Sequence, residues 1–381
     1  MDLTQLLAFT MQNNASDLHL SAGSPPIIRS SGDIKRVKAD PLSSDDIRTM
    51  LYSVMTENQR SEFEDNLETD FAIALGEKAR FRVNGFTSRL GVCAVFRTIP
   101  TEVPTIDELG LPPVIRRLAQ LERGIVLVTG TTGSGKSTTL ASMVNHINRN
   151  DSKHILTIED PVEFFHKSQK SLVNHREVGA DTKSFSTALR SALREDPDVI
   201  LVGEMRDYET ISLALTAAET GHLVFGTLHS NNASKTIDRI IDAFPTGDKE
   251  MVRAMLSSSL QGVVAQKLLK KADGTGRVAA FEILVGTNAV RNLIRENQIP
   301  QMYSMMQTGS RYGMTTFNEN INDLLEEGVI DDEQARIALM EVAGTDDESD
   351  SGEYASAALG GGRIGDIPLE SLSQNDEGYS F

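Results

Sequence analysis

A glycine-rich loop between a continuous apolar run and a helical pattern limits what this chain can fold into. The apolar run is Gly124–Thr129, and the helical pattern covers residues 138–147. Such a run is typical of a strand buried on both faces, because a strand with one face in solvent alternates apolar and polar residues. The loop residues are Gly130, Thr131, Thr132, Gly133, Ser134, Gly135, Lys136 and Ser137. This strand–loop–helix unit predicts a parallel sheet with helical connections.

Three further apolar runs, at residues 155–158, 199–202 and 223–227, alternate with longer helical patterns. Buried strands that alternate with helices predict a parallel sheet covered by helices on both faces. We therefore expect an α/β domain over residues 113–340. No stretch reaches the roughly 18 apolar residues of a membrane-spanning helix, so we expect no membrane-spanning segment.

Residues 1–99 show shorter patterns, which predict a small α+β domain with an antiparallel sheet. Leu3, Leu6 and Leu7 are spaced as on a helix, and Ser43 is typical of a helix N-cap. The expected strands cover residues 17–20, 71–75, 80–86 and 91–98. Prolines recur between residues 100 and 112, so we expect this segment to link two domains.

Charge separates residues 341–381 from the rest of the chain. This segment holds ten acidic residues and one arginine, a net charge of −9 out of −17 for the whole chain. It has few large apolar side chains to offset the entropy of ordering, so we expect an acidic disordered tail. Neither part has the basic stripe of nucleic-acid-binding proteins, so we expect no nucleic-acid partner. The single cysteine, Cys93, excludes an internal disulfide and a cysteine-rich zinc site, and it indicates a reducing cytoplasm.

The loop matches the phosphate-binding pattern G-x-x-x-x-G-K-[ST], with the flanking strand and helix that this pattern requires. Its glycines let backbone N–H groups turn toward phosphate oxygens, and the helix N-terminus adds a favourable partial charge. Lys136 would reach the β- and γ-phosphates, and the Ser137 hydroxyl would ligate Mg²⁺. We expect residues 130–138, with Thr138 as the last, to bind ATP with Mg²⁺. The alternative is a glycine-rich turn without a ligand.

Three carboxylates, Glu159, Asp160 and Glu163, follow the second apolar run. They would lie at the carboxyl end of its strand, where open parallel sheets bind ligands, and could orient the waters of Mg²⁺ or an attacking water. Asp before Pro161 is also good chemistry for a helix N-cap, which is the favoured interpretation of Asp160. From composition alone, Glu159 and Glu163 fit a helix start as well as catalysis.

Glu204 ends the apolar run Val199–Val202 as a Walker B carboxylate does, in the position that lies beside Mg²⁺. Gly203 stands where such strands usually carry Asp, so Glu204 is left alone and a contact to Mg²⁺ through water is expected. The alternative is a solvated glutamate at the end of a strand.

Two histidines flank the fourth apolar run, His222 at its start and His229 just beyond its end. We expect His229 at the same edge as the loop and the carboxylates, where a neutral imidazole could sense a γ-phosphate or relay its loss. His222 follows Gly221, which resembles a helix C-cap, so it could equally be a hydrogen-bonded loop histidine.

These four elements, in this order, resemble the Walker A, Asp-box, Walker B and His-box series of secretion ATPases. The match is closest to type IV pilus retraction ATPases of the PilT type, and it covers residues 1 to about 340. Gly203 agrees with the family's Walker B, Thr131 stands where Pro is common, and the acidic tail is similar to that of longer accessory paralogues of the PilU type. Further matching segments are residues 16–20, 79–84, 94–100 and 289–296.

The resemblance implies a RecA-like P-loop ATPase domain preceded by a PAS-like domain, in a ring-shaped homohexamer. It implies an ATP-driven motor for pilus retraction and twitching motility, cytoplasmic and peripheral at the inner membrane. The implied partners are an inner-membrane platform protein and paralogous pilus ATPases. The alternatives are an accessory PilU-like retraction ATPase and a nucleotide-dependent regulatory or scaffold subunit with little turnover. Assembly ATPases usually carry a four-cysteine zinc insertion, which one cysteine cannot supply.

For the site, the resemblance implies Glu163 as the catalytic base, beside Glu204 and His229, and arginines of the N-terminal domain that close on the γ-phosphate. Strand parity supports Arg97 independently, because it shares an otherwise apolar face with Cys93 and its neighbours and should have an anionic partner. That partner could be a core carboxylate or a nucleotide phosphate. Arg82 is the second candidate, and simple solvation is its alternative.

The segment 289–296 resembles a motif tied to retraction rather than to ATP turnover. Val290 and Ile294 lie on an apolar helical face, while Arg291 and Arg295 lie four residues apart on another. We expect the polar face to transmit force or to contact a partner; the alternative is an ordinary amphipathic helix with solvated arginines.

Overall fold

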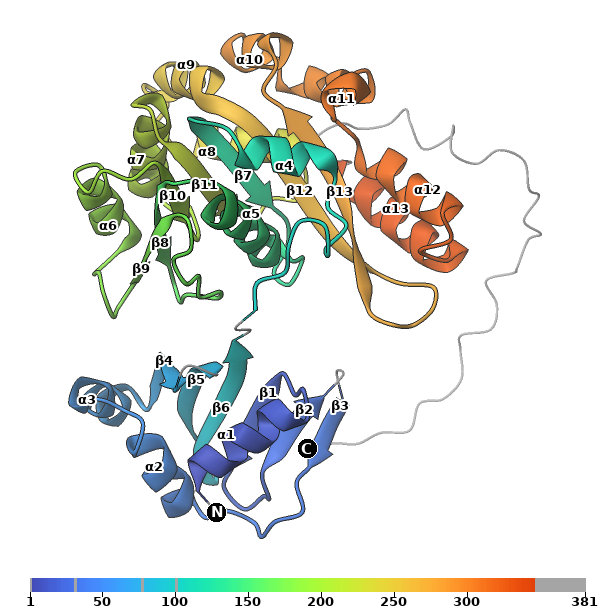
Figure 1. Cartoon of the computed structure of the whole chain (residues 1–381). Coiled ribbons are helices and arrows are strands. Elements are labelled where there is room, and N and C mark those ends of the chain that lie inside the picture. Colours follow the sequence, from blue (N-terminus) through green and yellow to red (C-terminus); the bar gives the residue numbers. More distant parts are fainter. Residues whose placement is uncertain (1, 31–32, 77–78, 100–101, 347–381) are drawn as a thin grey trace, which may run out of the picture.

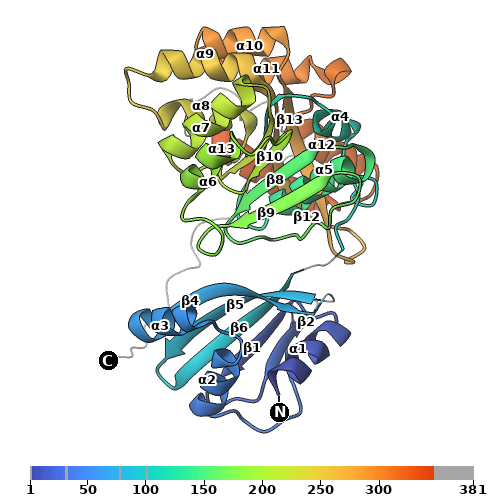
Figure 2. The same cartoon turned by 60° about the vertical axis from the view of Figure 1, so that its left-hand side comes forward.

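A computed structural model of the chain describes residues 2–30, 33–76, 79–99 and 102–346, and these residues form two sheets with their covering helices. Figures 1 and 2 show the sheets in two separate bodies, with the N-terminal sheet below the larger one. Residues 347–381, which make up most of the predicted acidic tail, lie outside the described residues.

The N-terminal sheet is antiparallel, in the order β3-β2-β1-β6-β5-β4. One face buries Leu18, Phe81 and Phe96 against the helices, and the Ser43 hydroxyl caps α2 as predicted. The predicted α+β arrangement is therefore confirmed. Its elements are α1 (Leu3–Gln12), β1 (Asp17–Ser21), β2 (Ile27–Ser30), β3 (Asp33–Arg36), α2 (Ser44–Tyr52), α3 (Glu57–Asn66), β4 (Glu68–Leu75), β5 (Ala79–Ser88) and β6 (Gly91–Ile99).

The larger sheet has the order β13-β12-β7-β11-β10-β8-β9, and its neighbours are parallel except β12 and β13. The predicted buried strands at residues 124–129, 155–158, 199–202 and 223–227 are all present. The antiparallel hairpin at one edge was not predicted. The strands are β7 (Gly124–Thr129), β8 (His154–Glu159), β9 (Leu172–Glu177), β10 (Val199–Val202), β11 (Leu223–Leu228), β12 (Leu260–Lys270) and β13 (Arg277–Val285).

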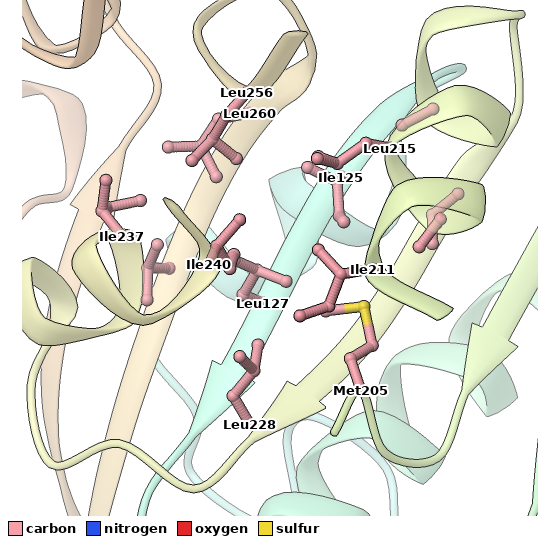
Figure 3. Packing of buried hydrophobic residues seen from close by; sticks show 14 of the residues in the cluster. Ile125, Leu127, Met205, Ile211, Leu215, Leu228, Ile237, Ile240, Leu256 and Leu260 are labelled. Atoms are coloured by element: carbon pink, nitrogen blue, oxygen red, sulfur yellow. The ribbon is translucent and has the colours of Figure 1, made fainter. Parts of the chain in front are cut away.

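Helices cover both faces of this sheet, because alternate residues of each strand point to opposite sides. Val126 and Val128 pack against α4 (Pro113–Ala119) and α5 (Lys136–Asn150). Ile125 and Leu127 pack on the other face with Ile211, as Figure 3 shows. The helices of that face are α6 (Phe185–Ala192), α7 (Tyr208–Glu219), α8 (Ala233–Asp242), α9 (Lys249–Ser259), α10 (Asn288–Arg295) and α11 (Met302–Gln307), with the short turns η1 (Ile299–Gln301) and η2 (Ser310–Tyr312). None of the described helices has the length and apolar content to cross a bilayer.

The C-terminal helices α12 (Phe317–Glu326) and α13 (Asp332–Asp346) pack against the β12–β13 hairpin. The expectation that the chain becomes disordered after residue 340 is wrong for its first six residues. They continue α13, and Val342 is buried with Ala338 in the apolar cluster beneath this helix. Sequence composition hid this last helical turn, because Glu341 faces solvent and the single valine, Val342, supplies the contact.

We expect Val342→Ala to lower the free energy of unfolding by about 2 kcal/mol, because it removes two buried methyl groups and leaves a small cavity. The measurement is urea denaturation of the full chain. Met340→Ala, on the exposed side of the same helix, is the matched control and should unfold like the wild type. Equal unfolding of both variants would show that the end of α13 is not part of the core.

Candidate active site

Four strands of the larger sheet end at one edge and bring the predicted site residues together. In the parallel register, Thr129 of β7 lies beside Leu228 of β11, and Val202 of β10 lies beside Ile158 of β8. The residues that follow these strands therefore emerge side by side. They are the loop from Gly130, the carboxylates from Glu159, the pair Gly203 and Glu204, and His229.

The glycine-rich loop is folded as a phosphate cradle at the start of α5. Gly130 has φ 143°, and a Cβ there would lie 2.4 Å from the backbone oxygen of Gln266 and 2.5 Å from Ser134 Oγ, so only glycine fits. The Lys136 ammonium folds back and donates to the oxygens of Gly130 and Thr131, both at 2.9 Å. Ser134 Oγ is buried and has no hydrogen-bond partner among the residues that the structure describes. A buried hydroxyl without a partner and a lysine bonded only within the loop fit a phosphate ligand.

Charges around Lys136 connect the loop to the two candidate carboxylates. Burial lowers the pKa of Lys136, while the negative charges of Glu204 and Glu163 oppose this shift. Both carboxylates therefore lie within electrostatic reach of the ammonium. The structure thus brings Lys136, Glu163 and Glu204 together, as their positions after β7, β8 and β10 predict.

Glu204 is held by two partners and is not a solvated strand-end glutamate. Its Oε1 lies 2.5 Å from Arg206 Nε and 3.1 Å from His229 Nε2, and 19% of its side chain is exposed. Burial alone would raise the pKa of Glu204, but the hydrogen bond and charge of Arg206, with His229 and Lys136, lower it below the ordinary value. Glu204 therefore stays ionised at neutral pH, as a ligand of a metal or of its waters must be.

The segment after β8 is irregular, so the helix-capping interpretation of Asp160 is wrong. No helix begins between residues 160 and 171, and the next element is β9. Glu163 is exposed at the site edge, and its N–H lies 3.4 Å from Glu159 Oε2. Because neither Glu159 nor Glu163 is part of a helix start, the structure removes the main alternative to a role for Glu163 in the site.

The close approach of β8 explains why glycine stands at position 203, where Walker B strands usually carry Asp. A Cβ at this position would lie 3.2 Å from Glu159 Cα and 3.2 Å from the Ile158 oxygen, and the Gly203 N–H donates to that oxygen at 2.8 Å. A side chain at this position would therefore crowd the backbone of β8, which would have to move by a few tenths of an ångström. The buried Glu159 takes up the adjoining space.

The residues present fit Mg²⁺ bound together with a nucleotide. Among the described residues, no group of three or more His, Cys, Asp or Glu side chains could hold a metal alone. Mg²⁺ typically takes one or two protein ligands and completes its shell with phosphates and water. Ser137, half-buried in the first turn of α5, and the ionised Glu204 are the groups that suit this arrangement.

The two histidines of β11 lie at opposite ends of the strand, as predicted. His229 is at the site edge, where it pairs with Glu204. His222 is a loop histidine: its Nδ1 lies 3.0 Å from the Ala217 oxygen, and its N–H donates to the same oxygen. Only His229 belongs to the site.

The two candidate arginines of the N-terminal sheet, Arg82 and Arg97, both pair with aspartates. Arg97 does not lie on a buried face: its side chain is 67% exposed, and the core face of β6 carries Phe96 instead. Its Nε donates to Asp17 Oδ1 at 2.9 Å, so the carboxylate alternative for its partner is the one observed. Arg82 is half-exposed and makes a two-pronged contact with Asp70, at 3.1 and 2.6 Å.

Two residues near the site were not anticipated. Arg206 pairs with Glu204, and only its position two residues further on could have pointed to it. Gln266 on β12 is buried, lies against the loop glycines, and accepts a hydrogen bond from Thr139 at 2.8 Å. Its position could not be inferred, because β12 is far from the loop in sequence.

The arginines of α10 differ from each other, contrary to the expectation of one polar face. Arg291 is half-buried, and its guanidinium donates to the oxygens of Gly286 (2.8 Å), Ser257 (3.1 Å) and Ser258, and to Gln261 Oε1 (3.2 Å). It therefore fastens α10 to the end of α9 and to the hairpin. Arg295 is exposed.

Comparison with known proteins gives consistent matches over almost the whole described chain. The family model of type II/IV secretion system proteins matches residues 2–342. A Pseudomonas aeruginosa protein named type IV pilus retractation ATPase PilT is 58% identical over 336 residues, 88% of this chain and 97% of that protein. A Neisseria gonorrhoeae protein named twitching motility protein is 57% identical over 82% of this chain and 83% of that protein. The crystal structure of the pilus retraction motor PilT with bound ADP has a TM-score of 0.83 at 50% identity, covering 89% of this chain and 97% of that one.

We expect Gly203→Ala to lower the free energy of unfolding by about 1–3 kcal/mol and to slow ATP turnover, because the methyl group would push β8 away from Glu204. Urea denaturation and a steady-state ATPase assay measure the two effects. Gly247→Ala is the control, since a Cβ there meets open space. Wild-type behaviour of Gly203→Ala would contradict the close approach of the two strands.

Proposed function

The chain belongs to the family of type II/IV secretion system proteins, and from this premise we propose that it is the ATP-hydrolysing motor of type IV pilus retraction. The observation that carries the proposal is the phosphate cradle beside the ionised Glu204 and its partner His229, in a chain that matches pilus retraction ATPases nearly end to end. A regulatory subunit with little turnover would not need this complete set of catalytic groups.

In the proposed reaction, the loop N–H groups and Lys136 hold the phosphates of ATP. Lys136 exchanges its contacts with the loop oxygens for contacts with the β- and γ-phosphates. Mg²⁺, when bound by Ser137 and by Glu204 through water, neutralises charge on the γ-phosphoryl group. Glu163 orients or deprotonates the attacking water, and His229 holds Glu204 and responds to loss of the γ-phosphate.

We propose that the motor does its work by moving one of its two bodies against the other. ATP hydrolysis would shift the N-terminal sheet against the larger sheet, with Arg82 and Arg97 closing on the γ-phosphate. We propose that six copies form a ring in the cytoplasm, docked at the inner membrane on an integral-membrane platform protein, where they extract pilin subunits. Paralogous pilus ATPases would share this platform.

We expect Glu163→Gln to keep ATP binding and to lower kcat by about 10²-fold or more, because the base is lost while its shape remains. Lys136→Ala should instead lose ATP binding, since phosphate charge is left uncompensated. A fluorescent ATP analogue measures binding, and single-turnover kinetics measure hydrolysis. Glu122→Gln, before β7 at the opposite edge of the sheet, is the control and should turn over normally. Normal hydrolysis by Glu163→Gln would remove Glu163 from the reaction.

We expect the two arginines of α10 to separate force output from folding. Arg295→Ala should fold and hydrolyse ATP normally yet fail to restore twitching in cells that lack the native copy. Arg291→Ala should lower the free energy of unfolding by about 1–3 kcal/mol, because four oxygens lose their donor. Twitching zones at equal protein levels, and urea denaturation, are the measurements. Full motility with Arg295→Ala would contradict the force-transmitting role of this face.

A further inference from the structure

A row of charged side chains crosses the N-terminal sheet on the face opposite its apolar core. Asp70 lies on β4, Arg82 on β5, Arg97 on β6 and Asp17 on β1. In the strand register, Arg82 stands directly opposite Arg97, and Arg97 directly opposite Asp17. Asp70 is the diagonal neighbour of Arg82, since it pairs with the residue two positions further along β5.

The two arginines at the centre of this row should repel each other. Like charges directly opposite in an antiparallel pair destabilise a sheet. Each arginine, however, is paired on its outer side: Arg82 Nη2 lies 2.6 Å from Asp70 Oδ2, and Arg97 Nε lies 2.9 Å from Asp17 Oδ1. The order of charges across β4, β5, β6 and β1 is therefore minus, plus, plus, minus, and the aspartates offset the repulsion. On the far side of Asp17, Arg29 of β2 stands opposite it with its Nε 4.0 Å from Asp17 Oδ2, a longer contact than that of Arg97.

Asp17 is buried, whereas the side chain of its partner Arg97 is largely exposed. The side chain of Asp17 is 7% exposed, and Oδ2 accepts a hydrogen bond from Ser16 Oγ at 2.8 Å. Burial raises the pKa of Asp17, but the hydrogen bonds from Arg97 and Ser16 lower it below the ordinary value, so the carboxylate stays charged. Arg97 is thus held through Nε, and the exposed remainder of its side chain leaves guanidinium N–H groups for a second anion.

The Arg82 end of the row lies against the candidate active site. Arg80, on the same strand face, places its guanidinium 4.1 Å from the centre of the Phe165 ring. The pKa of Arg82 is raised first by its hydrogen bond to Asp70, and also by the charges of Asp160 and Glu163. The β5 strand therefore faces the segment that carries the proposed base, and Figure 2 shows the sheet on that side of the larger body.

We propose that Asp17 and Asp70 are positioning residues of the ATPase reaction, which hold the Arg97 and Arg82 guanidinium groups side by side as a paired receptor for the γ-phosphate. This inference rests on the proposed function, in which the two arginines reach the nucleotide. Neither aspartate touches the reacting atoms; each acts through its arginine. Without its aspartate, an arginine turns away from its like-charged neighbour, and the pair is no longer preorganised.

A double-mutant cycle on the full-length chain tests whether Asp17 acts on the reaction through Arg97. We expect Asp17→Asn to lower kcat about 10- to 100-fold while KM for ATP changes less than about threefold, because the loop still binds the ground state. Arg97→Ala should lower kcat at least as much. The double variant should be no slower than Arg97→Ala alone, since Asp17 has no further path to the reaction.

The possible outcomes separate this inference from the proposed function. Wild-type kcat in Arg97→Ala would remove the arginine from the reaction, and the inference with it. A slow Arg97→Ala beside a normal Asp17→Asn would overturn the inference alone. So would an equal loss from Asp17→Asn in both backgrounds, because that loss would be structural. Asp33→Asn, an exposed aspartate of β3 in the same sheet, is the control and should keep wild-type kcat.

If Asp17→Asn does not fold, the pair of Asp70 and Arg82 still tests the inference. Asp70 is 41% exposed, so Asp70→Asn should leave folding intact. We expect Asp70→Asn to lower kcat, with no additional effect in an Arg82→Ala background. If Asp70→Asn lowered kcat equally in the wild type and in an Arg82→Ala background, Asp70 would not act through Arg82, and its positioning role would be overturned.

Discussion

The parallel pairing of β7, β8, β10 and β11 is the constraint on which the rest of the structure depends. These strands are buried on both faces, so a slip of one residue would exchange their two sets of packing partners and is strongly disfavoured. Their register makes four loops begin at one edge. Apolar residues that touch no ligand therefore determine how far Lys136 lies from Glu204, and the charged groups need no long loops to meet.

Charge balance at that edge is the second organising feature. Lys136 is desolvated, and its charge is supported by Glu204 and Glu163; Glu204 is in turn shared by Arg206 and His229. The N-terminal sheet also pairs basic groups with carboxylates, since Arg82 and Arg97 lie between Asp70 and Asp17. In both places carboxylates offset the charge of basic groups. The Lys136 ammonium donates to backbone oxygens and is influenced by the carboxylates only through their charge, whereas Arg82 and Arg97 are hydrogen-bonded to theirs.

Local sequence could predict the loop, the buried strands and the edge at which they end, since each depends on a few consecutive residues. The same signals predicted the sheet edge at which Glu163, Glu204 and His229 lie. They could not show that Gly203 is needed for the approach of β8, that Gln266 lies behind the loop, or that Arg291 is a clamp. Each of these depends on a contact between distant segments. Arg97 was misplaced because Cys93 and Ile99 are buried at the ends of a strand whose outer face is open in the middle.

The strand β12 connects two sites that lie far apart in the larger sheet. It touches the nucleotide loop through Gln266 and, five residues earlier, meets the α10 clamp through Gln261. The pairing of β12 with β7 is irregular between Leu260 and Gly262 and regular from Gly262 onward. Because a strand rises about 3.3 Å per residue, these two points lie about 17 Å apart along the strand. The loop that fits a phosphate and the base of α10 are therefore joined by one interior strand of the sheet rather than by a flexible connection.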